Sequence, residues 1–385
     1  MLFRLFATLI LLFCGSFSAF AQAKGPALHR GLNLSNWLAN AERQPMTERD
    51  FAQIAGAGFD HIRLPVNPEL LGFHLDQKPG SLDLKAVDAA LAMAVKYHLA
   101  VILDIHPSGT FMDKLEKNAS AEENFIGLWD VLARHYDEKN YPPSQLSFEL
   151  LNEPHYYPAE KHYAEFMQNL MNAIRQSSPQ RLIVIGAPHG SSLDGLLSMQ
   201  PLLDPNIIYD FHFYEPYMVT HQGIHRGFEK KMLRYFHDVP YPASKVDHEA
   251  DFYAADAPSQ GQAEKELRDY VQDGWSSEVV AGRIVLASHW ATEHHMRVMC
   301  GEFGALRNHI DAPSRYRWIA DTRKALDANG IGWDLWDYAD LMGIVQLQGD
   351  VSTPDPVDGS IRLNDVTKGS RVFEPEALQA LLSEK

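Results

Sequence analysis

The sequence predicts an α/β fold, a single-domain (β/α)8 barrel, or TIM barrel. Eight short apolar runs alternate with segments whose apolar residues recur at helical spacing. The runs are almost continuously apolar, as expected for parallel strands that are buried on both faces. Polar residues follow these runs at their carboxyl ends, where barrels of this type place their functional residues. A doubly wound open sheet is the structural alternative.

The predicted strands and helices alternate along the chain. Strands are expected at 29–33, 59–66, 99–107, 146–154, 181–190, 206–216, 298–303 and 330–338. Helices are expected at about 48–58, 84–99, 121–136, 158–176, 262–273, 279–295, 314–329 and 375–382. Thr47 followed by Asp50 resembles a capping box at the start of the first helix, and glycines end that helix. The distance between the sixth and seventh strands predicts a long insertion at about 217–296.

The first 23 residues have the pattern of a secretory signal peptide. Arg4 is followed by an apolar core and then by Ala21-Gln22-Ala23, which is an A-x-A cleavage site. The apolar core is short for a membrane span, and a retained membrane anchor is the alternative. Cleavage after Ala23 would leave 24–385 as the mature domain, either periplasmic or secreted. Cys300 is then the only cysteine, so no intramolecular disulfide can form.

Composition limits the partners of the protein. The formal net charge of −16 argues against nucleic acid or an anionic membrane surface as a partner and is compatible with a neutral substrate. The sequence has no internal repeat, low-complexity tract or Ser/Pro/Thr-rich linker, so no appended binding module is expected. We therefore expect one large, core-stabilised monomer that makes no membrane contact after removal of the signal peptide.

Two glutamates lie at the ends of predicted strands. Glu153 is in the run LSFELLNEP (146–154), and Glu302 is in VMCGEF (298–303). Burial of a carboxylate costs free energy, so an acidic residue at the end of an apolar strand suggests a functional role. A barrel brings the carboxyl ends of its strands to one face. Two carboxylates there are the minimum set for acid–base and nucleophilic chemistry on a glycosidic bond.

Other residues follow the strands in an order that resembles glycoside hydrolase family 5, the cellulase family. The set is Arg63, His106, Asn152-Glu153-Pro154, His212-x-Tyr214, Glu302 and Trp336. The resemblance extends from Arg30 to about Gly343. It implies a retaining barrel enzyme that needs no cofactor and acts on a β-linked polysaccharide or oligosaccharide.

The resemblance implies a division of labour between the two glutamates. Glu153 would be the general acid/base, and its surroundings should raise its pKa so that it carries a proton. Glu302 would be the nucleophile, held as a carboxylate by Arg63 and the Tyr214 hydroxyl. A retaining mechanism requires the two carboxyl groups to lie about 5 Å apart.

The resemblance also implies that other members of the set surround the sugar. Asn152 resembles the family's asparagine that binds the sugar 2-hydroxyl, a contact that strengthens in the transition state. His106 and His212 resemble the family's histidines around the scissile bond. Trp336 resembles the aromatic floor beneath the sugar ring.

Two segments indicate β-1,4-glucan as the substrate. Residues 31–36 (GLNLSN) resemble the GxNLGN opening of family endoglucanases, with serine in place of the second glycine. Residues 214–223 resemble the YxPxxFTHQG segment of some family cellulases, with valine in place of phenylalanine. The cleft candidates that these segments add are Asn33, Trp37, Tyr217 and His221. The leading interpretation is an endo-β-1,4-glucanase. The alternatives are an exo- or endo-acting β-1,3-glucanase, a xyloglucanase and a β-mannanase.

Other functional classes fit the sequence less well. The spacing of His289, Glu293 and His294 is one residue off the inverted zinc-protease pattern, and no HExxH motif is present, so no metal is predicted. No G-x-S-x-G elbow follows a predicted strand, which argues against a serine hydrolase. A non-catalytic carbohydrate-binding barrel is the remaining rival. Such a barrel would be expected to have lost one of the two glutamates.

Overall fold

The computed structural model describes residues 25–35, 37–39, 46–156, 160–202, 204–224, 231–348 and 370–383. The signal peptide expected at 1–23 lies outside the described residues. Within the described ranges, no helix combines the length and the apolar character that crossing a membrane requires.

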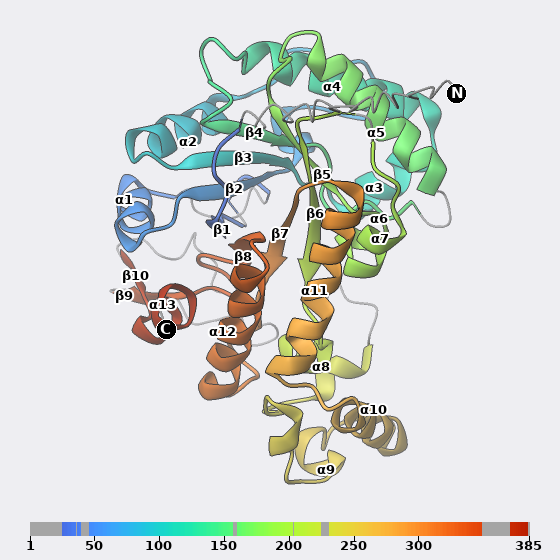
Figure 1. Ribbon diagram of the computed structural model, residues 1–385, viewed down its shortest axis with the longest axis vertical. Helices are drawn as coiled ribbons and strands as arrows, with labels where there is room; N and C mark the ends of the chain where they lie inside the picture. Colours follow the sequence, from blue (N-terminus) through green and yellow to red (C-terminus); the bar gives the residue numbers. More distant parts are fainter. Residues whose placement is uncertain are drawn as a thin grey trace, which may run out of the picture.

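Eight parallel strands close into a barrel in chain order (Figure 1). Their bounds are β1 Arg30–Asn33, β2 His61–Val66, β3 Ala100–Ile105, β4 Leu146–Glu149, β5 Leu182–Gly186, β6 Ile207–Phe213, β7 Val298–Phe303 and β8 Gly332–Leu335. The last strand pairs with the first, with Leu32 opposite Leu335. The predicted (β/α)8 barrel is therefore confirmed, and the open doubly wound sheet is excluded.

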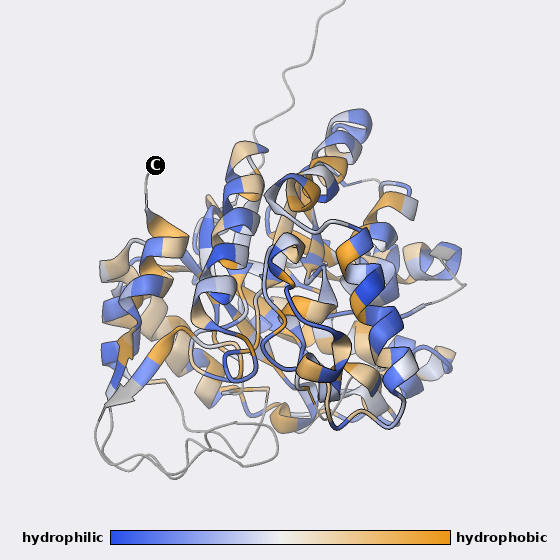
Figure 2. Ribbon diagram, turned by 90° about the horizontal axis from the view of Figure 1, so that it is seen from below, coloured by the Kyte–Doolittle hydropathy of each residue, from blue (hydrophilic) through white to orange (hydrophobic). Residues whose placement is uncertain are grey.

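Helices cover the outside of the barrel. The main ones are α1 Glu48–Ala57, α2 Lys85–Lys96, α4 Ala119–His135, α5 Glu160–Arg175, α7 Leu193–Ser198, α11 Ser277–His294, α12 Ala312–Ala328 and α13 Pro375–Leu382. Figure 2 shows hydrophilic and hydrophobic residues alternating along them. In α5 the buried residues Tyr163, Phe166, Met167 and Leu170 recur at helical spacing. This apolar stripe packs the helix onto the core.

Short elements complete the fold. They are η1 Pro68–Leu71, α3 Gly109–Leu115, α6 Pro188–Ser191, and a hairpin of β9 Val345–Gln348 and β10 Ser370–Phe373. The capping box predicted at Thr47 and Asp50 is present at α1, and Gly58 ends that helix with φ 98°. Asp50 also accepts a hydrogen bond from Arg371 of β10 at 2.7 Å. The hairpin, which the sequence patterns did not predict, is thereby tied to α1.

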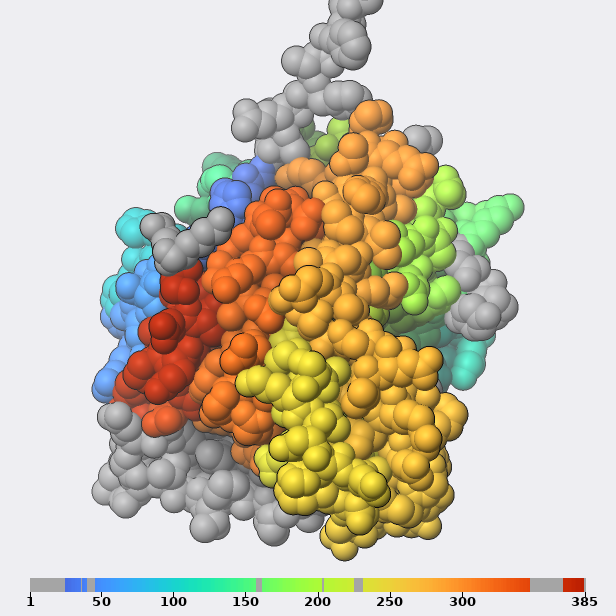
Figure 3. Space-filling model, turned by 60° about the horizontal axis from the view of Figure 1, so that its bottom comes forward, coloured from blue at the N-terminus to red at the C-terminus, as the bar shows by residue number. Residues whose placement is uncertain are grey.

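The predicted insertion lies between β6 and β7, but its bounds differ from the prediction. Its elements are α8 Tyr217–Thr220, η2 Lys231–Tyr235, η3 Ala243–Lys245, α9 Ala250–Tyr253 and α10 Gln260–Gln272. The prediction of 217–296 also included α11, which packs against α7, α12 and β7 as a regular helix of the outer ring. The additional elements therefore end before α11. Figure 3 shows this segment, coloured yellow to gold, as a lobe at one end of the molecule.

The fourth strand is shorter than predicted. β4 ends at Glu149, four residues before Glu153, whereas the apolar run suggested a strand that continues to Pro154. Beyond Glu149 the chain keeps isolated hydrogen bonds to both neighbouring strands: Leu150 N–H to the Val184 carbonyl and Asn152 N–H to the Ile105 carbonyl. Glu153 itself has φ 43°, in the left-handed region, so it cannot continue a strand.

Candidate active site

A cavity of about 320 Å³ opens at the carboxyl ends of the barrel strands. Eight of the twelve predicted site residues line it: His106, Asn152, Glu153, Tyr214, Tyr217, His221, Glu302 and Trp336. They come from five strands or the loops that follow them, in keeping with the predicted location. Three of the others are buried below it: Arg63 and His212 contact lining residues, and Asn33 contacts Arg63.

The two glutamates face each other in this cavity. One carboxylate oxygen from each, together with a ring nitrogen of His212, forms a group whose atoms all lie within 4.8 Å of one another. This spacing agrees with the separation of about 5 Å expected for a retaining glycosidase. Glu302 is almost fully buried, whereas the Glu153 side chain is 43% exposed. The left-handed backbone at Glu153 costs about 1–3 kcal/mol, and such strain is typical of functional sites.

Arg63 and Tyr214 hold the Glu302 carboxylate. Arg63 Nη1 donates to Oε1 at 2.7 Å, and the Tyr214 hydroxyl donates to Oε2 at 2.8 Å. The structure thus contains both predicted contacts. Burial nevertheless raises the pKa of Glu302, and the cationic His212 and Arg63 offset that effect only in part.

The Arg63 guanidinium also organises the side chains below the cavity. It donates twice to Glu149, at 2.7 and 2.6 Å, and once to Asn152 Oδ1 at 2.7 Å. A further carboxylate oxygen, from Asp104, lies 3.1 Å away, and Asn33 Oδ1 accepts from Nη1 at 2.9 Å. Since the oxygen of Asn152 is bound to Arg63, its amide nitrogen faces the cavity, where it lies 3.3 Å from His106 Nε2 and can use its second N–H as a donor. This orientation suits recognition of a hydroxyl group.

His212 lies between the two glutamates. Its Nδ1 is 2.9 Å from Glu153 Oε1 and 3.4 Å from Glu302 Oε2. Burial alone would lower the pKa of His212, but the charges of Glu302 and Asp210 raise it well above its ordinary value. Burial alone would raise the pKa of Glu153, but the hydrogen bond and charge of His212 lower it. The prediction that the surroundings raise the Glu153 pKa was therefore wrong, because the adjacent His212 favours the ionised form of Glu153.

His106 and Trp336 form one wall of the cavity. Their rings stack with centroids 5.6 Å apart at an interplanar angle of 17°. His106 is fixed by Asp104, whose Oδ2 lies 2.9 Å from Nδ1. The stack presents an aromatic surface beside polar groups, which suits the apolar face and the hydroxyls of a sugar ring.

Three predicted residues need separate comment. Asn33 is fully buried and donates to the Gly301 carbonyl at 2.9 Å, so it supports the site from below. His221 lines the cavity and packs edge-on against Tyr214 at 5.0 Å. Trp37 was predicted as a cleft residue, but it is buried in the core against the Phe51 ring and does not line the cavity. The structure gives it a packing role because its ring lies against Phe51 of α1.

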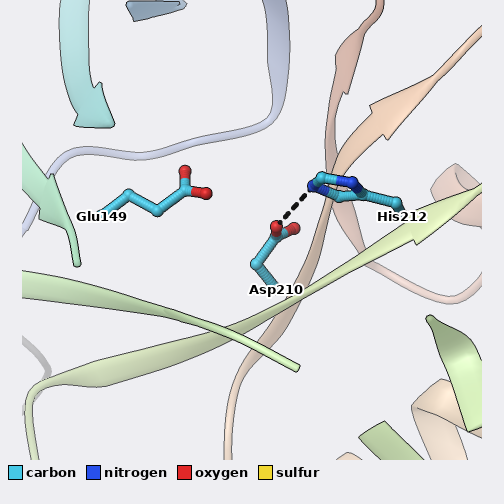
Figure 4. Close-up of side chains that lie close together, drawn as sticks. All are labelled: Glu149, Asp210 and His212. Atoms are coloured by element: carbon cyan, nitrogen blue, oxygen red, sulfur yellow. Dashed lines mark ion pairs between the residues drawn. The ribbon is translucent and has the colours of Figure 1, made fainter. Parts of the chain in front are cut away.

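The prediction missed buried acidic residues inside the barrel. Glu149 of β4 and Asp210 of β6 lie close to His212 (Figure 4), and Asp104 of β3 contacts Arg63. Each occurs within an apolar strand, such as IIYDFHF in β6. An acidic residue within a doubly buried strand must find a positive or donating partner. This signal was present in the sequence and could have identified them.

Two groups of side chains in the described residues have the spacing of metal ligands. They are Glu149, Asp210 and His212, and Glu153, His212 and Glu302. Both groups require a lone pair on His212, and the charges of Glu302 and Asp210, which raise its pKa, favour the protonated ring instead. Arg63 already supplies positive charge to Glu149 and Glu302. The arrangement is therefore suited to acid–base and nucleophilic chemistry.

Comparison with known proteins gives consistent matches. The family model described as cellulase (glycosyl hydrolase family 5) matches residues 21–341. Endoglucanase 3 of Fibrobacter succinogenes is 27% identical over 342 residues, which cover 83% of this chain and 50% of that protein. This chain therefore spans half the length of that relative. Endoglucanase C of Acetivibrio thermocellus is 28% identical over 324 residues, covering 80% of this chain and 90% of that protein.

Solved structures share the fold. An endoglucanase of Thermotoga maritima aligns with a TM-score of 0.68 at 22% identity, covering 92% of this chain and 97% of that one. The cellulose synthase subunit Z of Clostridioides difficile aligns with a TM-score of 0.68 at 23% identity, covering 93% of this chain and 100% of that one. At these identities the likeness establishes the barrel architecture and no more.

Proposed function

This chain belongs to the cellulase family, glycosyl hydrolase family 5, and we propose that it is an exported endo-β-1,4-glucanase that acts with retention of configuration. The observation that carries the retaining mechanism is the approach of Glu153 and Glu302 oxygens within 4.8 Å. An inverting enzyme would need about 6.5–9.5 Å between the carboxyl groups to accommodate a water molecule. Two relatives bear the name endoglucanase, which supports glucan as the substrate.

The proposed reaction is a double displacement. Glu302 attacks the anomeric carbon while Glu153 protonates the departing oxygen, which yields a glycosyl ester on Glu302. Glu153 obtains its proton from His212 Nδ1, 2.9 Å away. Glu153 then deprotonates a water molecule, the hydroxide attacks the anomeric carbon, and the Glu302 carboxylate leaves. Arg63 holds Glu302 in its ionised form before attack and after release.

Neighbouring cavities support action within glucan chains. A cavity of about 820 Å³ is lined by the insertion and by loops after β5 and β6, and Tyr217 lines both it and the central cavity. Another, of about 470 Å³, lies at the loops after β2 and β3. In a closed barrel with strands in chain order, these two groups of loops lie across the barrel from each other. A polymer could then extend past the central cavity on both sides.

The insertion contributes Trp275 to the larger cavity, where its side chain is partly exposed. We expect Trp275→Ala to lower kcat/KM on a long soluble β-1,4-glucan by roughly three- to tenfold, because an aromatic contact of about 0.5–1.5 kcal/mol is lost. An aryl cellobioside is too short to reach this cavity and should be hydrolysed at the wild-type rate. Phe252→Ala is the matched control, since Phe252 is 63% exposed on α9 and lies outside the cavity. Equal losses on both substrates would contradict a role for Trp275 in binding the polymer.

Product analysis tests the proposed function itself. The purified mature protein is assayed on carboxymethyl-cellulose, mixed-linkage glucan, xyloglucan, β-1,3-glucan and β-mannan. The expected result is a rapid fall in the viscosity of β-1,4-linked glucan, with the new reducing ends first appearing in the β configuration. Release of single sugars with slow loss of viscosity would indicate an exo-enzyme. Preference for another polymer would make that polymer the assigned substrate in place of β-1,4-glucan. Inactivity on all five would favour a non-catalytic carbohydrate-binding barrel.

A further inference from the structure

A β-bulge shapes the site between β6 and β7. Asp210 pairs with Met299 and Phe211 with Cys300, but the next pair is His212 with Glu302, so Gly301 is the extra residue. Side chains alternate between the two faces of a strand, and a shift of one residue exchanges the faces. Without the bulge, Glu302 would point away from His212. The bulge is therefore what directs Glu302 into the barrel.

The Asp210 carboxylate holds this bulge from inside the barrel. Its Oδ1 accepts a hydrogen bond at 2.5 Å from the Gly301 N–H, which the bulge removes from the strand ladder. The fit is close, because a Cβ atom at position 301 would lie 2.5 Å from Oδ1 and 2.7 Å from Oδ2. Only glycine leaves room for Asp210 at this point. The residue immediately after this contact is Glu302.

The second oxygen of Asp210 faces the imidazole of His212. Oδ2 lies 3.1 Å from Nε2, and both side chains are almost completely buried (Figure 4). The contact is an ion pair, because the two atoms do not meet the geometry of a hydrogen bond. The negative charge beside Nε2 favours a proton on that nitrogen. The other ring nitrogen, Nδ1, then points to Glu153 Oε1 at 2.9 Å.

From this geometry we propose that Asp210 is the positioning residue for both glutamates, acting on Glu302 through the Gly301 bulge and on Glu153 through His212. The inference rests on the proposed catalytic roles of Glu153 and Glu302. Asp210 itself touches no substrate. It fixes the distance between the two carboxylates and keeps available the proton that His212 passes to Glu153.

The groups around His212 determine how the Asp210–His212–Glu153 contacts respond to pH. The charged and titratable groups that face it are Asp210 of β6, Glu149 of β4, Glu153 beyond β4, and Glu302 of β7. Arg63 and Tyr214 bind Glu302 as well. Removal of the Asp210 charge lowers the pKa of His212, so the Glu153–His212 pair loses its proton at a lower pH. Activity that depends on this proton should then be lost at a lower pH on the alkaline side of the pH profile.

Asp210→Asn tests the proposal, because asparagine keeps the size but loses the charge. We expect the alkaline limb of the kcat/KM profile to move down by about one pH unit. We also expect kcat on β-glucan to fall roughly 10- to 100-fold, because part of the contribution of general acid catalysis, about 10²- to 10⁴-fold in all, is lost. On an aryl cellobioside whose phenol leaves without protonation, kcat should fall much less. Equal losses on both substrates with an unmoved pH limb would overturn the proposal.

The barrel offers a matched control in a second buried Asp–His pair. Asp334 Oδ1 lies 3.0 Å from His61 Nε2, and both side chains are fully buried, but neither lines the cavity. Asp334→Asn should leave unchanged both the alkaline limb and the ratio of rates on the two substrates. Changes like those of Asp210→Asn would show a general effect of losing a buried charge and would contradict the specific role of Asp210.

A spectroscopic measurement keeps the proposal testable without activity and without a folded Asp210→Asn variant. In wild-type protein with ¹⁵N-labelled histidine, the His212 ring should stay doubly protonated to well above pH 6.5, with its signals assigned by their loss in His212→Asn. Titration near 6.5 would overturn the proposal even if Asp210→Asn failed to fold. Inactivity of the wild type on every glycan would instead overturn the proposed function, and the titration would still report on the Asp210–His212 pair.

Discussion

Replacing Glu302 with glutamine should lower kcat on soluble β-1,4-glucan by at least about 10⁴-fold, because the amide cannot form the glycosyl ester. The fold should survive, since glutamine has the same shape and its oxygen can still accept from Arg63 or Tyr214. Circular dichroism and thermal unfolding would verify this. Glu122→Gln is the matched control: Glu122 is a buried glutamate on α4, hydrogen-bonded by Tyr156 at 2.9 Å, outside the cavity. Turnover by Glu302→Gln close to the wild-type rate would refute the nucleophile assignment.

The stereochemistry of chemical rescue separates the roles of the two glutamates. In Glu302→Ala, azide can occupy the space of the missing carboxylate and attack an activated aryl cellobioside directly, which gives a product of inverted configuration. In Glu153→Ala, azide would instead attack the glycosyl ester on Glu302, and the two successive displacements would retain the configuration. The opposite pair of products would exchange the two assignments.

Replacing Arg63 with methionine should lower the free energy of unfolding by roughly 3–5 kcal/mol, because it leaves buried carboxylates without their cation. Glu149 and Asp104 are the most affected, since both are fully buried and both contact the guanidinium. Urea unfolding followed by tryptophan fluorescence measures this loss. Lys96→Met is the surface control, because Lys96 pairs with Glu48 on the exposed side of the molecule, and we expect no measurable change there.

The pH dependence identifies the cause of that loss. Burial raises the pKa of Glu149 to about 8 even beside Arg63, and loss of the guanidinium should raise that pKa further above its unfolded value. Such groups stabilise the folded state when they are protonated, so the deficit of the variant should shrink as the pH falls toward 4. A deficit that is equal at all pH values would point to lost packing and would contradict the electrostatic explanation.

Much of this architecture could be predicted because its signals are local. Apolar runs separated by helical patterns indicated the eight strands, and the polar residues at their ends indicated one functional face. Eight predicted residues line the central cavity for this reason. The error over Trp37 has the same origin: an aromatic residue outside the strands looks alike in sequence whether it lines a cleft or packs against a helix such as α1.

The features that sequence reasoning missed depend on contacts between distant strands. The pKa of Glu153 is set by His212, 59 positions away, and a pattern within one strand cannot show that distance. The bulge at Gly301 requires the register of β6 against β7, which emerges only when both strands are paired. The end of the insertion was misplaced because α11 reads as a helix in sequence whether it belongs to the outer ring or to the lobe.

The closure of the barrel constrains when this protein can fold. β1 obtains its second neighbour only from β8, and Asn33 Nδ2 donates to the Leu335 carbonyl 302 positions away. Contacts of such separation form late, because the entropy of closing the loop must be paid first. A growing chain would leave the ribosome with β1 lacking one partner until nearly all of the polypeptide had been synthesised. Under the export proposed above, this delay would keep the polypeptide in a form that a translocation channel can thread.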